Sequence, residues 1–495
     1  MPQPHPQPLP NGFRVELDPD TQVLEGGRVL LGGQPRRLLR LSDAGAAALA
    51  ALREGPVRTV ASGKLARRLV SVGAAHPRPP RGAFTGSAVV IVPVRDRVTE
   101  LDRCLSSLGH CHDVIVVDDG SVDSSAVAKV VARHGARLVQ RPHNGGPAAA
   151  RNSGLQAVDR AEIVAFLDSD CVAPPDWLDN LLAHFADPAV AAVAPRVMPA
   201  PAARSSMLAR YAALRSPLDL GPRETLVHPG TRVSYVPTAA LVVRTEAMGS
   251  SWFDESLRYG EDVDLVWRLI DAGWQVRYDP AVLVRHAEPE TWPAFLGRRF
   301  RYGTSAGPLS QRHPTRLAPM VLHPWPSAVT GLLLARRPAL AGLAATVATV
   351  ATIQLARRLH KSGVPQPTTA AASMTSEAVT MTALGLGRAV TQLALPAALI
   401  GSTAFRGHRV ERVATLAALV LTPTLRDWLT LRPPLDPVRW SLASIADDLA
   451  YGAGVWSGAV TARTIKPLLP RRGSPDRVAR SGGQLVAHTP AEPVA

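Results

Sequence analysis

Ile163-Val-Ala-Phe-Leu-Asp-Ser-Asp170 joins five consecutive apolar residues to two aspartates. An unbroken apolar run of this length predicts a strand buried on both faces, because a half-exposed strand would alternate apolar with polar residues. Val114-Ile-Val-Val-Asp-Asp119 repeats the pattern earlier in the chain. Packing does not explain carboxylates at the ends of buried strands, so both pairs are candidate functional groups.

The surrounding domain, which we place at 88–310, alternates such strands with helical segments up to about residue 280. Strands are predicted at 89–92, 114–117, 137–140 and 163–167, and helices at 99–108, 124–134 and 148–157. This order predicts an α/β domain with a mostly parallel, Rossmann-like sheet that helices cover on both faces. Ligands bind at the carboxyl ends of the strands in such sheets, which is where the acidic pairs lie.

A smaller unit at 1–80 precedes this domain. Short apolar runs joined by Gly-Gly turns predict strands, and Ser42 is expected to cap the first of two helices, with the second at 64–72. This order predicts a winged-helix-like α+β module, which the Pro- and Arg-rich stretch His76–Gly82 would link to the sheet domain. The module resembles PqqD-like domains, which implies a precursor peptide as partner. A structural cap on the sheet domain explains the same order.

Residues 320–465 are predicted to be α-helical and apolar. From Pro338 to Ala356 the chain carries no charge, and an arginine pair flanks this stretch on each side. It is just long enough to span a bilayer, whereas a second stretch, Ala389–Phe405, is borderline. Ala, Thr and Gly dilute both, so spanning, buried and surface-lying helices all fit, and we expect membrane contact. The polar, basic tail at 470–495 predicts disorder.

The composition bounds the setting in which the chain acts. A length of 495 residues predicts two or more domains, and the formal net charge of +15 comes almost entirely from arginine. This charge suits an anionic membrane surface or a phosphorylated substrate, and nucleic acid is not an expected partner. Three cysteines lack the spacing of a zinc site or a disulfide framework, and Met1–Pro10 lacks a secretory signal. We therefore expect the cytoplasmic face of the membrane.

Asp168 and Asp170 are candidates for metal binding. If the chain stays extended, their side chains project to the same side, because strand side chains alternate with period two. Carboxylate oxygens bind Mg²⁺ and Mn²⁺, and such an ion would stabilise the charge of a diphosphate leaving group. The pair therefore predicts a divalent metal site for a phosphorylated substrate.

Asp118-Asp-Gly-Ser121 ends the other buried strand. A turn followed by a helix cap explains Gly120, which permits an unusual backbone angle, but it does not require Asp118. The Asp118 carboxylate could instead accept the imide hydrogen of uracil. Further along, Asn144 could cap a helix whose first turn contains Pro147. The free amides of that turn, together with Arg151, would attract an anion such as a diphosphate.

Glu261-Asp262 begins a predicted helix at 263–272. The helix dipole alone favours acidic residues at this end, which is a sufficient structural explanation. A group-transfer reaction, however, needs a carboxylate that takes the proton of the acceptor hydroxyl. The pair is therefore also a candidate for the catalytic base.

These motifs occur in one order, as Val90-Ile-Val-Pro-Val94, Asp118-Asp-Gly-Ser121, Asn144–Asn152, Asp168-Ser-Asp170 and Gly260-Glu-Asp262. Over about residues 88 to 300 the chain resembles family 2 glycosyltransferases. The resemblance implies a GT-A fold, a UDP-sugar donor, Mg²⁺ or Mn²⁺ as cofactor, and inversion at the anomeric carbon.

The matched positions imply a division of roles. Asp262 would be the general base, with Glu261 beside it. Donor binding is implied for Pro93, Val94, Asp118, Asp119, Gly120, Asn144, Gly145, Arg151, Asp168 and Ser169, and metal binding for Asp168, Asp170 and His286. Arg298 and Arg301 lie in Arg298-Arg-Phe-Arg-Tyr302, which looks like a degraded Gln-x-x-Arg-Trp acceptor motif. A basic amphipathic surface explains this segment equally well.

The order of the whole chain is similar to the glycosyltransferases of the mycofactocin biosynthesis system. That resemblance implies transfer of glucose from UDP-glucose to a peptide-derived redox cofactor or its precursor, building a short β-linked oligosaccharide. A polyprenyl-phosphate or cell-envelope glycosyltransferase would suit the apolar stretches equally. A non-catalytic scaffold that binds a peptide is the alternative from another class, and the intact set of carboxylates argues against it.

Overall fold

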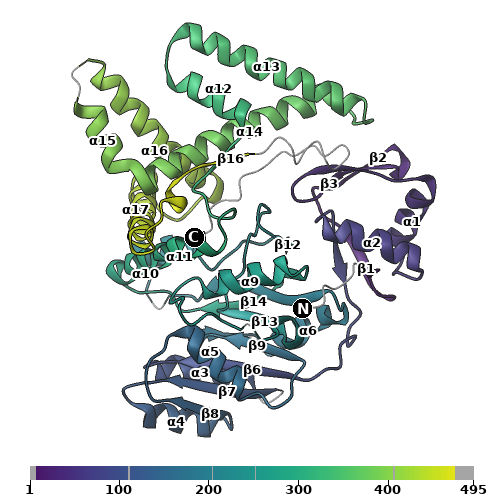
Figure 1. Ribbon diagram of the computed structural model, residues 1–495, viewed down its shortest axis with the longest axis vertical. Coiled ribbons are helices and arrows are strands. Elements are labelled where there is room, and N and C mark those ends of the chain that lie inside the picture. The colour runs from purple at the N-terminus through teal and green to yellow at the C-terminus, as the bar shows by residue number, and fades with distance from the viewer. Residues whose placement is uncertain (1–6, 110–111, 203, 251, 405–406, 474–495) are drawn as a thin grey trace.

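The structure is a computed structural model, and it describes residues 7–109, 112–202, 204–250, 252–404 and 407–473. A small N-terminal module, a central sheet domain and a set of long helices make up the chain (Figure 1). Most of the tail that we expected to be disordered lies outside the described residues. At the start of that tail, Arg471–Arg472 (β16) pairs with Val321–Leu322 (β15), so the expected disorder is wrong for these residues.

The N-terminal module contains two small sheets and two helices. Its elements are β1 (Arg14–Leu17), β2 (Gln22–Leu24), β3 (Val29–Gly32), β4 (Arg37–Arg40), α1 (Asp43–Glu54), α2 (Val60–Ser71) and β5 (Ala75–Arg78). Ser42 caps α1 as expected, since its Oγ accepts a hydrogen bond from Gly45 N at 3.2 Å. The sequence did not predict β4 or β5. Because β5 pairs antiparallel with β1, the stretch from His76 to Arg78 belongs to the module and is not a linker.

The central domain has the expected α/β architecture with a mostly parallel sheet. Within the described residues the strand order is β10-β14-β11-β13-β9-β6-β7-β8, with β12 beside β14. These strands are β6 (Ala88–Val94), β7 (Asp113–Asp119), β8 (Arg137–Arg141), β9 (Ile163–Leu167), β10 (Cys171–Val172), β11 (Val190–Pro199), β12 (Thr225–Val227), β13 (Ala240–Arg244) and β14 (Gln275–His286). Strands β6 to β9 run parallel, whereas β13 is antiparallel to both β9 and β11.

Helices cover both faces of this sheet, which is why its central strands β6 and β9 are apolar along their length. One face packs on α3 (Val98–Leu108), α4 (Ser124–Arg133) and α6 (Trp177–Leu182), and the other on α5 (Pro147–Gln156) and α9 (Glu261–Asp271). Alternate residues of β6 enter different clusters, with Val90 and Val92 on one side and Ile91 on the other. The parallel strands β6, β7 and β9 therefore end at one edge, where the acidic pairs gather.

The C-terminal helices are joined to the sheet domain by close packing. The C-terminal set is α12 (Pro324–Leu334), α13 (Pro338–His360), α14 (Pro367–Ala389), α15 (Leu395–Ala404), α16 (Arg409–Leu431) and α17 (Pro437–Thr461). Three earlier helices, α7 (Met207–Arg215), α10 (Trp292–Thr304) and α11 (Ala306–Arg312), belong to the sheet domain or directly follow it. A Cβ added at Gly303 of α10 would lie 2.2 Å from Tyr451 O of α17, so the two helices touch backbone to backbone. Arg299 and Asp447 form a buried ion pair across the same contact. The helical region is thus continuous with the sheet domain.

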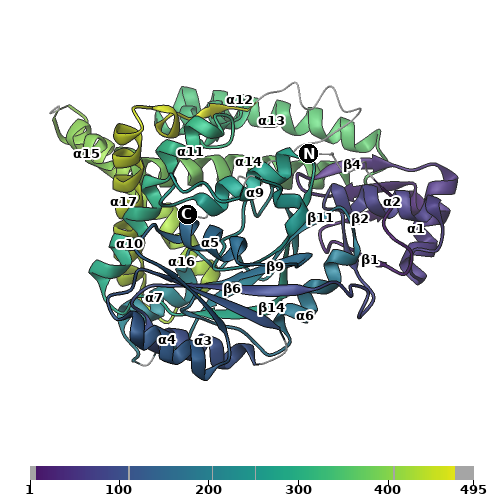
Figure 2. The ribbon, with the colours of Figure 1, turned by 60° about the horizontal axis from the view of Figure 1, so that its bottom comes forward.

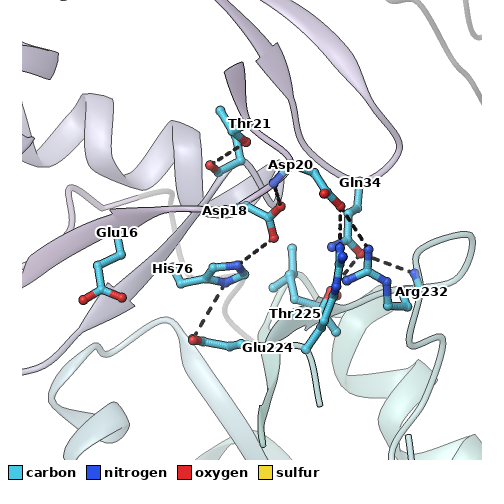
Figure 3. A network of polar contacts seen from close by, with 12 residues as sticks. Glu16, Asp18, Asp20, Thr21, Gln34, His76, Glu224, Thr225 and Arg232 are labelled. Atoms are coloured by element: carbon cyan, nitrogen blue, oxygen red, sulfur yellow. Dashed lines mark hydrogen bonds and ion pairs between the residues drawn. The ribbon is translucent and has the colours of Figure 1, made fainter. Parts of the chain in front are cut away.

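The N-terminal module docks on the sheet domain through polar contacts. Arg67 of α2 donates two hydrogen bonds to Asp187, at 2.6 and 2.7 Å, and both side chains are buried. A second network joins the module to the segment around β12 (Figure 3). There His76 Nε2 lies 2.9 Å from Asp18 Oδ2, and its Nδ1 lies 3.7 Å from Glu224 Oε1. These contacts fix the module to the sheet domain.

Candidate active site

Asp118 and Asp119 end β7, and both are buried. Asp118 Oδ1 accepts a hydrogen bond from Ser121 N at 2.9 Å, which closes the turn after the strand. Asp119 binds the loop before α5, because its Oδ1 accepts from Gly145 N at 2.9 Å and its Oδ2 from Gly146 N at 2.8 Å. Asp119 therefore holds two loops together, and Asp118, which is 1% exposed, orients the turn.

Gly120 brings the same two loops into backbone contact. Its φ is +70°, and an added Cβ would lie 2.8 Å from Asn144 N. The expectation that Asn144 caps α5 is wrong, because Gly146 is the N-cap and Asn144 Oδ1 accepts from Gly146 N at 3.0 Å. Asn144 lies two positions before the N-cap, and Asp119 accepts hydrogen bonds from the Gly145 and Gly146 amides.

Asp168-Ser-Asp170 forms a turn and does not continue the strand. β9 ends at Leu167, and Cys171 N donates to Asp168 O at 2.9 Å. The prediction that the backbone stays extended through Asp170 is therefore wrong. The turn leads the chain into β10, which pairs antiparallel with β14. As a result Asp168 and Asp170 have separate partners. Ser169 between them is buried.

Arg151 of α5 links the Asp168 turn to the Glu261-Asp262 pair. Its Nη2 donates to Asp168 Oδ1 and its Nη1 to Glu261 Oε1, each at 2.8 Å. The guanidinium also lies over the Phe253 ring, 5.6 Å from its centroid. Burial alone would lower the pKa of this guanidinium, but the carboxylates of Asp168 and Glu261 have the larger, opposite effect. The pKa is raised overall, so the group stays charged. The sequence suggested that Arg151 would be a free cation that attracts an anion. That expectation is wrong, because the carboxylates of Asp168 and Glu261 already neutralise it.

Asp170 contacts Arg97 and approaches His286. Its Oδ2 lies 3.5 Å from His286 Nε2, because β10 pairs Cys171 with His286. Arg97, in the loop after β6, also pairs with this carboxylate. On the other side of the imidazole, His286 Nδ1 lies 3.7 Å from Glu288 Oε1. Burial alone would raise the pKa of Glu288, but the opposing effect of His286 and Arg298 is larger. The pKa is therefore lowered to about 2, and Glu288 is a carboxylate at neutral pH.

These residues fit a divalent cation. Among the described residues no three metal-ligating side chains are already clustered. Asp170 and His286 nevertheless offer an oxygen and a nitrogen that are near enough to bind one ion, while substrate oxygens complete its coordination. His286 Nδ1 is buried and has no hydrogen-bond partner in the described part of the chain, and Glu288 faces it. A carboxylate in that position orients a metal-bound histidine.

Glu261 and Asp262 begin α9, directly after Gly260, whose φ is +84°. Glu261 is 6% exposed and bound to Arg151, whereas Asp262 is partly exposed and its Oδ1 accepts from Val263 N at 2.8 Å. Burial raises the pKa of both carboxyls, and the charge of Arg151 counteracts part of the rise. Asp262 is thus the member of the pair that a substrate can reach.

The Arg298–Tyr302 segment lies in α10 and serves mainly to pack the fold. Arg298 pairs with Glu288, and Arg299 with Asp447, whereas Arg301 is exposed. The structure therefore does not join Arg298 and Arg301 into one acceptor site. Burial raises the pKa of Tyr302 to about 12, and the negative charge of Asp262 contributes to the rise.

Comparison with known proteins identifies the family of the chain. The family model described as Glycosyl transferase family 2 matches residues 89–244. The pre-mycofactocin glycosyltransferase of Mycobacterium tuberculosis is 40% identical over 477 residues, which cover 94% of this chain and 98% of that protein. The chain is a family 2 glycosyltransferase. The glycosyltransferase AglE of Haloferax volcanii is a weaker match to this enzyme, 26% identical over 43% of the chain and 71% of AglE.

One solved structure is also similar to this glycosyltransferase. It is the mannosyltransferase PcManGT from Pyrobaculum calidifontis in complex with GDP-Man and Mn²⁺, which is 19% identical. The match covers 70% of this chain and 89% of the mannosyltransferase, with a TM-score of 0.38.

Three residues of the glycosyltransferase site were missed by sequence reasoning. Arg97 pairs with Asp170, Glu288 faces His286, and Arg141 Nε donates to Asp119 Oδ1 at 2.9 Å. Glu288 carried a usable signal, because a residue two positions beyond His286 in an extended chain lies on the same side. Arg97 and Arg141 carried none, since loop and strand-end arginines are common in this sequence.

Proposed function

We propose that this glycosyltransferase transfers a hexose, glucose from UDP-glucose, with inversion to a peptide-derived acceptor of mycofactocin biosynthesis. Similarity to the M. tuberculosis pre-mycofactocin glycosyltransferase along nearly its whole length supports the pathway. Glucose, the UDP carrier and the growth of a β-linked oligosaccharide follow from the resemblance of the motifs to the family.

The pair of hydrogen bonds that Arg151 makes with Asp168 and Glu261 carries the proposal. It brings the end of β9, the body of α5 and the start of α9 to one point at the carboxyl edge of the sheet. Separate structural roles for these acidic groups would not require them to converge on one buried cation. A transferase does require it, because the donor and the general base must lie on opposite sides of one anomeric carbon.

On the donor side, the ends of β6 and β7 would receive the uracil base. Val94 pairs with Asp118 in the parallel register, and Pro93 beside it is partly exposed. Because Asp118 is nearly completely buried, it would act by fixing the Ser121 turn, and Pro93 would contact the base. Asp168, whose side chain is 30% exposed, would contact the ribose or a phosphate.

The diphosphate would lie against Asp170 and His286, which are the residues placed to hold Mg²⁺ or Mn²⁺. The bound cation would supply charge neutralisation for the leaving diphosphate. Arg97 would remain beside the site as a second positive charge. Glu288 would keep the His286 ring in the orientation that presents Nε2 to the site.

On the acceptor side, Asp262 would act as the general base. Its carboxylate takes the proton of the acceptor hydroxyl while that oxygen bonds to the anomeric carbon, and the bond from this carbon to the UDP oxygen breaks. Arg151 opposes the protonation of Asp262 and Glu261, because its charge lowers the pKa of each against the effect of burial. Glu261 would hold Arg151 in place.

Two alternatives to this function are a glycosyltransferase with a polyprenyl-phosphate acceptor and a scaffold that only binds a peptide. A precursor peptide could reach the N-terminal module, whereas the apolar C-terminal helices would equally suit a polyprenyl-phosphate acceptor at the cytoplasmic face of the membrane. A peptide-binding scaffold would transfer no sugar at all.

The test measures sugar transfer from isotope-labelled UDP-glucose to a peptide-derived acceptor and to a polyprenyl-phosphate acceptor. UDP-galactose is the matched control donor, and mass spectrometry detects the products. We expect glucose only on the peptide-derived acceptor, and loss of the product in chelator that Mn²⁺ or Mg²⁺ reverses. Product on the lipid alone would overturn the acceptor, and full activity in excess chelator would overturn the metal. No product on either acceptor would support the scaffold.

A further inference from the structure

The uncharged stretch Pro338–Ala356 forms most of α13, whose outer face nothing in the described chain covers. The most apolar 18 residues of this 23-residue helix have a mean hydropathy of 1.7. Only 11% of these residues are buried. Leu343, Val350 and Ile353 are each 46% to 49% exposed. Their spacing of seven and three residues places them on one face of the helix.

Basic residues lie at both ends of that face. Arg357 follows Val350 by seven residues on the same helix, and Arg336 and Arg337 directly precede the first residue of the helix, Pro338. Arg336 and Arg357 are exposed, as are their neighbours Arg337 and Arg358. An apolar strip with arginines at its ends matches the surface of an anionic bilayer, where phosphates border the acyl chains.

The two ends of α13 contact the same folded body. At its C-terminal end, Leu359 packs in a buried cluster with Leu31 of the N-terminal module, and Arg40 Nη2 donates to Lys361 O at 3.3 Å. At the other end, α13 follows α12 and β15, which pairs with β16, and Arg336 donates to Glu411 O of α16 at 3.1 Å. Figures 1 and 2 both show α13 running from α12 to the N-terminal module.

This arrangement excludes a spanning orientation for α13. At about 1.5 Å per residue the helix is long enough to cross the bilayer core of about 30 Å. A crossing would nevertheless put the N-terminal module and the α12 end on opposite sides of the membrane. The ion pair between Arg67 and Asp187 holds that module on the sheet domain, so both ends must stay on one side.

We propose that α13 lies in the plane of an anionic phospholipid bilayer, with Leu343, Val350 and Ile353 in the acyl region and the terminal arginines among the phosphates. The chain then binds one leaflet and does not cross it. The inference does not depend on which sugar or acceptor the site uses.

The test uses the full-length protein and vesicles of phosphatidylcholine with or without phosphatidylglycerol. We expect co-sedimentation with the anionic vesicles, and Leu343→Asp with Val350→Asp should weaken it by about tenfold or more, because two apolar contacts are lost. Val60→Asp is the matched control, since Val60 is 65% exposed on the N-terminal module, and it should bind like the parent. Equal binding of the parent and the double variant would overturn the proposal.

The orientation of α13 in the bilayer needs a second measurement on vesicle-bound protein. The variants carry Arg337→Cys or Lys361→Cys in a background with Cys111→Ser. A membrane-impermeant maleimide added outside should label both positions, whereas Val350→Cys should be protected. Labelling of only one end before the vesicles are lysed would show a crossing and contradict the proposal. A parent protein that forms dimers blocked by Val350→Asp, without vesicle binding, would show that a second copy covers this face.

Discussion

Arg151 Nη1 and Glu261 Oε1 lie 2.8 Å apart in the protein interior, although 110 positions separate the two residues in the sequence. The other terminal nitrogen of the same guanidinium binds Asp168. One buried cation thus connects the donor-side turn to the start of the helix that carries Asp262. The two halves of the glycosyltransferase site are held at a fixed separation by this contact.

Replacing Arg151 by methionine should therefore lower stability and activity together. Glu261 would remain buried without its partner, and breaking a buried ion pair in this way costs about 3–5 kcal/mol. Denaturant unfolding checks the stability. The matched control is Arg133→Met, which removes an exposed ion pair with Asp102 and should change stability far less, because solvent screens such a pair. Equal costs for the two variants would contradict the role assigned to Arg151.

Activity should fall at low pH with an apparent pKa above the ordinary carboxyl value. Burial raises the pKa of Glu261 and Asp262, and Asp262 must be ionised to act as a base. Because the two carboxyls interact, the profile of kcat against pH reports the pair and not either residue alone. In Arg151→Met the acid limb should move to higher pH, since the cation that lowers both pKa values is gone. An unchanged limb would argue that another group is titrating.

The same groups give stability a pH dependence of known sign. Carboxyls in the unfolded chain ionise near pH 4, whereas the raised pKa keeps protons on the folded protein at higher pH. Between these values the folded state binds more protons, so the contribution of the pair to the free energy of unfolding decreases as pH rises. In Glu261→Gln this part of the dependence should be weaker, as measured by urea unfolding at several pH values. The opposite slope would mean that ion pairing outweighs burial.

Gly120→Ala should weaken donor binding. An alanine there adopts an unfavourable positive φ, and its Cβ would also press on the Asn144 backbone. Gly135→Ala is the matched control, because Gly135 has φ +64° but no atom within 4 Å of the added Cβ. The control should lose only about 1 kcal/mol of stability and keep its affinity for UDP. Calorimetric titration with UDP should separate the two variants, and equal affinities would show that the loop contact does not shape the donor site.

Asp187→Asn tests whether the N-terminal module is an integral part of the enzyme. The substitution leaves Arg67 buried without its counter-charge, so we expect a loss of about 3–5 kcal/mol. Limited proteolysis should then cut after the module more readily than in Arg133→Met. A variant as resistant as the parent would show that the module is held mainly by other contacts, such as those of His76 with Glu224 and of Asp20 with Arg232.

Local patterns predicted the positions of the acidic groups but not their partners. Apolar runs and glycine positions follow from short stretches of chain, so the strands that end at Asp119 and Leu167 were placed nearly as observed. A hydrogen bond such as that between Arg67 and Asp187 depends on how distant segments pack. No local pattern specifies it, and the same is true of Arg151 and Glu261.

The turn at Asp168–Asp170 shows a second limit of the sequence. Asp, Ser and Asp are acceptable both at a strand end and in a turn, so composition could not decide between them. The pairing of Cys171 with His286 decides it, because that register needs the chain to leave the strand at Leu167. The same register gives Asp170 a different neighbour from Asp168.

Transfer by Asp262→Asn is the most direct test of the central claim that this carboxylate is the base of a glycosyltransferase. Asparagine preserves the shape of the side chain but cannot take the proton, so kcat should fall by about a hundredfold or more. Affinity for UDP, measured by calorimetry, should stay close to that of the parent. Asp271→Asn, at the other end of the same helix, is the control and should retain activity. Full transfer by Asp262→Asn would contradict the account.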